Sequence, residues 1–185
     1  MAIQLAKKQS FDLTKRGASK ILVGLSWDQT VVGRASVDCD ASVVMLGADY
    51  KIPDEGSFVF YNNLHSTDGA VRHFGDNRDG AGDGDDEVIE INLGAVNPLV
   101  QYLYFVVTIH EAAARGHNFG NVASASIRIY KDTEELCNYT MADGVAEHDS
   151  VILGSMERKG TDWSFTSLSQ GFSGGLQAIV DLYVN

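Results

Sequence analysis

Short segments in which apolar and polar side chains alternate recur along the whole chain. The clearest is residues 20–28 (KILVGLSWD), in which Ile21, Val23, Leu25 and Trp27 fall on one face. Successive side chains of a β-strand point to opposite faces, so alternation with a period of two predicts a half-buried strand. A helix would need apolar residues three or four positions apart, and few segments of this chain have them.

The remaining segments extend this pattern into a fold class. Residues 102–110 (YLYFVVTIH) are nearly all apolar, which predicts a central strand covered on both faces. The 19 glycines against 2 prolines suit a chain with many tight turns. We therefore expect a mainly all-β chain, a two-sheet β-sandwich with few short helices. Other alternating or β-rich segments are residues 35–46, 57–63, 88–93, 122–130, 136–141, 150–158 and 162–168.

The chain shows no internal boundary. No linker, low-complexity run or repeat divides it, and 185 residues are enough to bury a sizeable core, so residues 1–185 are expected to form a single domain. The tail is ambiguous: Leu176, Ile179, Val180 and Tyr183 would share a stripe if residues 175–184 were helical. A short helix and a last strand both remain open for this segment.

An acidic, glycine-punctuated stretch at residues 76–87 (DNRDGAGDGDDE) leads directly into the alternating segment 88–93. It carries six carboxylates against the single cation Arg78, which makes its local charge −5. Gly80, Gly82 and Gly84 allow the backbone to fold back and to aim oxygen atoms at one point. Repulsion among these carboxylates would be relieved by a bound cation.

Calcium is the cation that this composition favours. Calcium takes about 6–8 oxygen ligands, and the stretch offers enough side-chain oxygens for one ion, or two if neighbouring loops add ligands. It contains no Cys or His for zinc or copper. An EF-hand register starting at Asp79 places Ala81 at a ligand position and a strand where a helix is required, so that motif is rejected. A β-helix repeat is rejected because the fragment occurs once.

Two interpretations remain open around this stretch. A charge run of this kind is most often a solvated surface loop with no ligand, although the regular glycines and the flanking strands favour metal binding. In residues 35–46, Val37, Cys39, Ala41 and Val43 fall on one face and the two carboxylates Asp38 and Asp40 on the other. Those carboxylates either face water or lend ligands to the acidic loop.

Composition excludes several classes of function. Acidic residues outnumber basic ones 25 to 14 and the pI is near 4.7, so a phosphate-backbone partner is not expected. No segment has the length of a signal-peptide core or of a transmembrane helix, which predicts a cytoplasmic protein. We expect Cys39 and Cys137 to remain reduced there.

The sequence resembles the tellurium-resistance (TerD-like) family of bacterial stress proteins. The resemblance is carried by GLSWD at 24–28, DCDAS at 38–42, FVFYNN at 58–63, FG at 119–120, ASIRIY at 125–130 and QGFSGGL at 170–176. Its most specific block is residues 66–93 (STDGAVRHFGDNRDGAGDGDDEVIEINL). Two positions depart from the family pattern, with Ser26 where Gly is usual and Cys39 where Leu is usual.

The resemblance implies a calcium-binding β-sandwich with the acidic stretch as its metal loop. The resemblance also implies that the protein binds other proteins of a stress complex. That complex would include a location at the inner face of the membrane. The residues implied in the loop are Asp76, Asn77, Asp79, Asp83, Asp85, Asp86 and Glu87. Matching nearby segments contribute Asp28, Asp38, Asp40 and Asp68.

The leading functional hypothesis is a non-catalytic, calcium-binding module of tellurium resistance and stress response that docks onto partner proteins. One alternative is a metal-dependent hydrolase acting on phosphates, but the five histidines are scattered without metal-ligand spacing and no nucleophile motif accompanies them. The other alternative is a structural module of a phage or mobile element. Direct reduction of tellurite is not favoured, since neither cysteine is placed as a reactive thiol.

Overall fold

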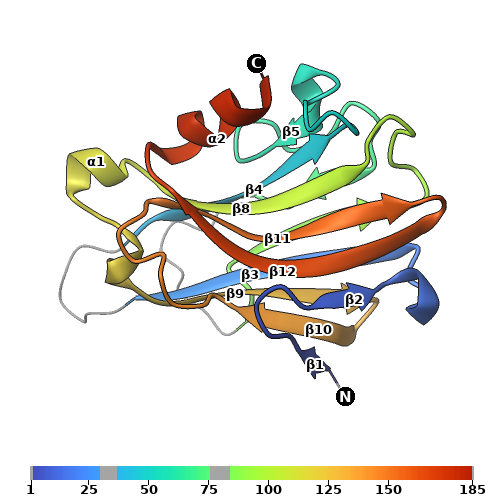
Figure 1. Cartoon of the computed structure of the whole chain (residues 1–185), viewed down its shortest axis with the longest axis horizontal. Coiled ribbons are helices and arrows are strands. Elements are labelled where there is room, and N and C mark those ends of the chain that lie inside the picture. Colours follow the sequence, from blue (N-terminus) through green and yellow to red (C-terminus); the bar gives the residue numbers. More distant parts are fainter. Residues whose placement is uncertain (1, 30–36, 76–83, 185) are drawn as a thin grey trace.

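The computed structural model describes residues 2–29, 37–75 and 84–184, and within them the chain forms two six-stranded sheets that face each other (Figure 1). Sheet A has the spatial order β1 (Ile3–Gln4), β10 (Glu134–Thr140), β9 (Val122–Lys131), β3 (Lys20–Gln29), β7 (Glu87–Asn92) and β6 (Val71–His73). Sheet B has the order β2 (Ser10–Asp12), β12 (Asp162–Phe172), β11 (Ser150–Lys159), β8 (Tyr102–Ile109), β4 (Cys39–Leu46) and β5 (Phe58–Val59). The expected two-sheet β-sandwich is confirmed.

The alternation in the sequence becomes the core between the sheets. Ile21, Val23, Leu25 and Trp27 of β3 all lie in this core with exposed fractions of 3% or less. The facing strand β8 occupies the middle of sheet B, where it pairs antiparallel with both β4 and β11. This position explains why residues 102–109 are apolar on both sides.

Strand β4 is buried on both faces, which the sequence did not predict. Val37, Cys39, Ala41 and Val43 belong to the core between the sheets, as expected. The opposite face of β4 does not meet water: Val44 and Leu46 belong to a second apolar cluster with Ile179 on the helix α2 (Gly175–Val184).

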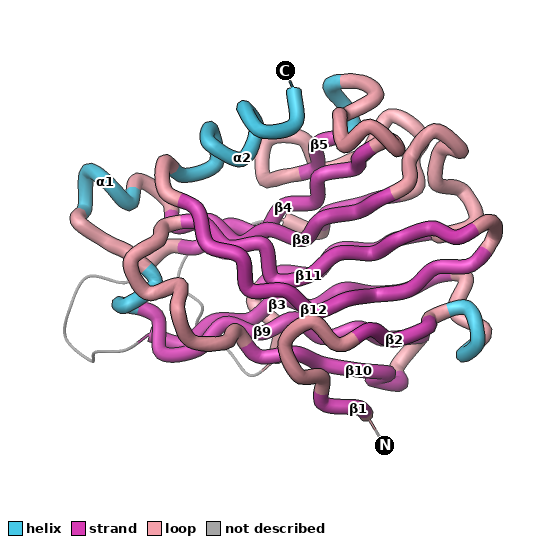
Figure 2. Tube along the Cα trace, viewed as in Figure 1, coloured by secondary structure: helices cyan, strands magenta, loops and turns pink. Residues whose placement is uncertain are grey.

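The C-terminal segment is therefore a helix. Leu176, Ile179, Val180 and Tyr183 of α2 form its apolar stripe and pack in that second cluster on the outer side of sheet B (Figure 2). The other helical elements in the described ranges are single turns: α1 (Ala112–Arg115) and the 3-10 turns η1 (Thr14–Arg16), η2 (Glu55–Ser57) and η3 (Phe119–Asn121).

The predicted strand at 57–63 is shorter than expected. Only Phe58 and Val59 pair with β4, because Phe60 and Asn63 bond to each other across a tight turn. The Asn63 side-chain amide also donates to the carbonyl of Phe58 at 2.6 Å. Local hydrogen bonds of this kind compete with a ladder and end the strand.

No helix in the described part of the chain is both long enough and apolar enough to cross a membrane. The longest, α2, spans ten residues.

Truncation of the core should cost far more stability than truncation of the surface. Leu103 of β8 is fully buried, whereas Leu99 in the preceding loop is 70% exposed. We expect Leu103→Ala to lower the free energy of unfolding by about 2–5 kcal/mol because it removes buried methyl groups and leaves a cavity. Leu99→Ala should change it by less than about 0.5 kcal/mol. Urea unfolding of both variants tests this; equal losses would contradict the packing.

Candidate metal centre at one end of the sandwich

Six carboxylates from three parts of the chain lie at one end of the sandwich, which we call the acidic end. Strand β3 finishes at this end and β7 begins there, since Leu25 pairs with Glu87. Strand β4 begins there in the other sheet, because Cys39 pairs with Ile109 at the finish of β8. The described carboxylates of the acidic end are Asp28, Asp38, Asp40, Asp85, Asp86 and Glu87.

Two hydrogen bonds to the backbone of β3 hold Asp86 in place. Its amide donates to the carbonyl of Leu25 at 2.8 Å. Its Oδ2 accepts from the amide of Trp27 at 2.8 Å. This side chain is thus fixed in place.

The environment of Asp86 disfavours its ionised form. Burial raises the pKa of Asp86 above its usual value, and the negative charges of Asp28 and Asp85 raise it further. The hydrogen bond from Trp27 and the charge of Arg128 act in the opposite direction without cancelling the effect. Because the folded pKa lies above the unfolded one, ionised Asp86 destabilises the fold at neutral pH, and this penalty disappears as the pH falls below the raised pKa.

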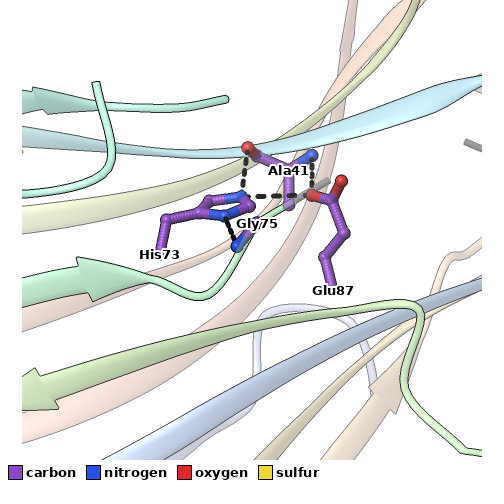
Figure 3. A network of polar contacts seen from close by, with 4 residues as sticks. All are labelled: Ala41, His73, Gly75 and Glu87. Atoms are coloured by element: carbon purple, nitrogen blue, oxygen red, sulfur yellow. Dashed lines mark hydrogen bonds and ion pairs between the residues drawn. The ribbon is translucent and has the colours of Figure 1, made fainter. Parts of the chain in front are cut away.

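Glu87 joins the two sheets. Its Oε2 accepts from the amide of Ala41 in sheet B at 2.7 Å, and it lies 3.2 Å from Nε2 of His73 in sheet A (Figure 3). The side chains of Glu87 and His73 are 1% and 0% exposed. A buried carboxylate with these partners forms a rigid polar link across an otherwise apolar core.

The tautomer of His73 follows from its partners. The amide of Gly75 donates to Nδ1 of His73 at 3.0 Å, so Nδ1 carries a lone pair. Nε2 therefore bears the proton, which it shares between the Ala41 carbonyl at 3.2 Å and Glu87. Both ring nitrogens of His73 thus have hydrogen-bond partners, and His73 has a structural role next to the acidic segment.

Asp85 turns away from Glu87 and lies on the outer side of sheet A. Its Oδ1 accepts from Nη1 of Arg128 at 2.8 Å. Burial, and after it the hydrogen bond to Asp85 and the charge of that carboxylate, raise the pKa of Tyr130 to about 12. Asp85 is therefore neutralised by a cation of the protein itself.

The other three carboxylates of the acidic end lie in different surroundings. Asp28 is exposed and accepts from the hydroxyl of Ser124 at 2.8 Å. Asp38 is partly buried just before β4. Asp40 is 6% exposed, and its Oδ2 lies 3.5 Å from Nδ1 of His110. Asp40 therefore does not simply face water, which had been one of the two open interpretations.

A buried thiol shows that the carboxylates share one region. Burial raises the pKa of Cys39, and the charges of Asp40, Asp38, Glu87 and Asp86 raise it further, in that order. Four carboxylates, at or just before the starts of β4 and β7, thus act on a single core atom. Both Cys39 and Cys137 are buried and free, and burial raises the pKa of Cys137 to about 12.

Asp68 does not join this group. It lies in the turn before β6, where its Oδ1 accepts from the Ser66 hydroxyl at 2.6 Å and from the Ala70 amide at 2.9 Å. Its Oδ2 accepts from the amide of Asn97 at 2.7 Å, in the loop after β7. That loop is at the opposite end of the sandwich from the start of β7, so Asp68 closes a turn there.

The remaining predicted ligands, Asp76, Asn77, Asp79 and Asp83, lie outside the described residues. Among the residues that are described, no three His, Cys, Asp or Glu side chains come close enough together to hold a metal ion. The described part of the acidic end therefore supplies converging negative charge but not a complete coordination shell.

Sequence reasoning missed the groups that hold the acidic segment in place. Arg128 and Tyr130 belong to an alternating strand to which no functional role was assigned, and His73 was only one of the scattered histidines. An arginine on the polar face of a strand is a weak signal, because cross-strand partners are set by the register of β3, β7 and β9. Ser26, unusual for the family pattern, is accommodated by a 2.8 Å hydrogen bond to Ser126 on the outer side of sheet A.

Fold and site together define a class: a two-sheet β-sandwich that gathers carboxylates from both sheets at one end. The TerD domain matches residues 1–183, so the chain belongs to the TerD family of tellurium-resistance and stress-response proteins.

Relatives in this family support the assignment over nearly the full length. The chain is 42% identical to general stress protein 16U of Bacillus subtilis (strain 168), covering 99% of this chain and 97% of that protein. It is 39% identical to tellurium resistance protein TerD of Serratia marcescens, again covering 99% and 97%.

A solved structure shows the same fold. It is described as a homologue of telluride resistance protein (TerD), SCO6318 from Streptomyces coelicolor A3(2), and superposes with a TM-score of 0.70 at 21% identity. The match covers 88% of this chain and 95% of that one.

Loss of the His73 link should destabilise the domain more than loss of a surface histidine. His73→Ala removes the Nε2 donor of the buried Glu87 carboxylate and leaves a cavity beside it, so we expect the free energy of unfolding to fall by about 2–4 kcal/mol although the Ala41 amide still donates. His65→Ala, at an exposed position, serves as the matched control and should cost less than about 0.5 kcal/mol. Equal effects in denaturant unfolding would mean that the link contributes nothing.

Proposed function

We propose that this protein is a calcium-binding, non-catalytic module of the tellurium-resistance and stress response, which docks onto partner proteins of a cytoplasmic stress complex. Calcium binds at the acidic end and neutralises carboxylates that the fold brings together. The relatives named for general stress and tellurium resistance support the cellular role.

The observation that carries the proposal is the gathering of carboxylates from both sheets at the acidic end, where the amide of Trp27 holds the side chain of Asp86 and a hydrogen bond joins Glu87 to Ala41. A partly buried carboxylate that two further carboxylates make harder to ionise is a place where a cation would gain energy. Calcium accepts an irregular shell of carboxylate and carbonyl oxygens, whereas magnesium requires a strict octahedron and keeps its waters. Carboxylate oxygens, which the acidic end supplies, are the ligands that calcium prefers.

A catalytic role is less well supported. Metal-assisted hydrolysis needs a general base or an oxyanion donor beside an open coordination position. The buried histidine nearest the acidic segment, His73, has both ring nitrogens occupied by Gly75, Ala41 and Glu87. His110 lies beside Asp40, which is buried in sheet B.

Calcium should stabilise the folded protein substantially, and magnesium less. An ion that binds only the folded state adds about 2.7 kcal/mol at one hundred times its dissociation constant, which is several degrees in melting temperature for a domain of this size. Scanning calorimetry in chelator, in calcium and in magnesium measures this. Equal melting temperatures in chelator and in millimolar calcium would refute the proposal.

Asp86→Asn removes the charge of this residue while keeping an oxygen that can accept the hydrogen bond from Trp27. Asparagine can still accept the Trp27 hydrogen bond, so the metal-free variant should be as stable as the original chain or slightly more stable. Its calcium-induced melting shift should be smaller, because one ligand charge is gone. Asp68→Asn, at the opposite end, is the control and should leave the calcium-induced shift unchanged.

The absence of phosphatase chemistry is testable on the same variants. With p-nitrophenyl phosphate and calcium, magnesium or manganese, we expect no turnover that depends on Asp86. Metal-dependent hydrolysis that Asp86→Asn abolishes while the melting temperature is retained would instead identify a hydrolase.

A further inference from the structure

Gly24 lies in the middle of β3, at a point where a side chain is physically excluded. It pairs with Val88 of β7 on one side and with Arg128 of β9 on the other. A Cβ placed on Gly24 would lie 2.0 Å from Oδ2 of Asp85. The Asp85 carboxylate therefore occupies the space that any other residue at position 24 would fill.

The partners of Asp85 are arranged around this space. Arg128, the cross-strand neighbour of Gly24, donates to Asp85 at 2.8 Å, and the Asp85 side chain is only 12% exposed. Tyr130, two residues further along the same face of β9, is near enough to the same carboxylate for Asp85 to contribute to its raised pKa. A charge-assisted bond at low exposure is among the stronger polar contacts of a protein surface.

Asp85 also comes directly before two residues, Asp86 and Glu87, that are fixed by hydrogen bonds. Gly84, just before it, has a φ of +125°, which an L-residue rarely adopts. Asp86 and Glu87, just after it, bond to β3 and to β4. Three consecutive side chains therefore point in different directions. Asp85 lies on the outer side of sheet A, Asp86 lies against the final residues of β3, and Glu87 lies between the sheets.

We propose that Gly24 and Arg128 form a seat for Asp85, so that Asp85 is a positioning residue that orients the acidic segment and is not itself a metal ligand. The seat holds the backbone at 84–87 so that the neighbouring Asp86 carboxylate points at the acidic end. The seat exists without metal; its effect on calcium affinity rests on the proposed function.

Three substitutions remove the seat, and two of them leave every carboxylate in place. Gly24→Ala forces the Asp85 side chain off the sheet, Arg128→Met removes its cation while keeping an apolar stem, and Asp85→Asn removes its charge. Matched controls are Gly94→Ala, where a Cβ meets no atom closer than 3.7 Å, and Arg72→Met, whose guanidinium lies 4.8 Å over the Phe74 ring on the same side of sheet A.

In chelator, each of the three seat variants should lower the melting temperature by a few degrees. The double variant Gly24→Ala with Arg128→Met should have a melting temperature no lower than that of the less stable single variant. Contacts that share one interaction are non-additive in this way. Additive losses would overturn the seat, and so would losses no larger than those of the two controls. This measurement needs no metal and stands whether or not calcium binds.

Calorimetric titration with calcium decides between positioning and ligation. If Asp85 only positions the segment, all three seat variants weaken calcium binding by about tenfold, and the controls do not. If Asp85 is a ligand for which Arg128 competes, Gly24→Ala and Arg128→Met tighten binding while Asp85→Asn weakens it, which would overturn the positioning role. No calcium binding by the original chain would refute the proposed function alone, because the experiment in chelator would still test the seat.

Discussion

The acidic end depends on one buried contact, the link from Glu87 to Ala41 and His73. A carboxylate without exposure to water is costly unless its oxygens are hydrogen-bonded, and here the donors come from both sheets. The link therefore fixes the distance between the sheets where the core would otherwise open. It also sets where β7 begins, and with it the position of the acidic residues that precede β7.

Geometry divides carboxylates that look equivalent in sequence into different roles. Glu87 bridges the sheets, Asp85 is neutralised by Arg128, and Asp68 closes a turn at the opposite end. Asp86 is held by the amide of Trp27, and burial and its acidic neighbours disfavour its ionised form. Cation binding at this end would act on that residue first, which connects the packing of the sandwich to the function proposed for it.

The residues with these different roles lie on the scaffold of a TerD domain, which spans residues 1–183. A β-sandwich is a stable scaffold, and the residues that differ in role lie at strand ends, where the backbone can present oxygens without disturbing the core. The relatives named for stress and tellurium resistance match this chain in sequence over 97% of their own length. The second face of sheet B, covered by α2, completes the burial of β4.

The sequence by itself determined the fold class and the acidic character of one loop, because a period of two and a run of carboxylates are local properties. It also located the core face of β3, since Ile21, Val23, Leu25 and Trp27 need no partner to be recognised. It could not show that β4 is covered on both sides or that Asp68 lies far from Asp86. Those facts depend on which strands pair and in which register, and such long-range contacts are decided only when the two sheets close on each other.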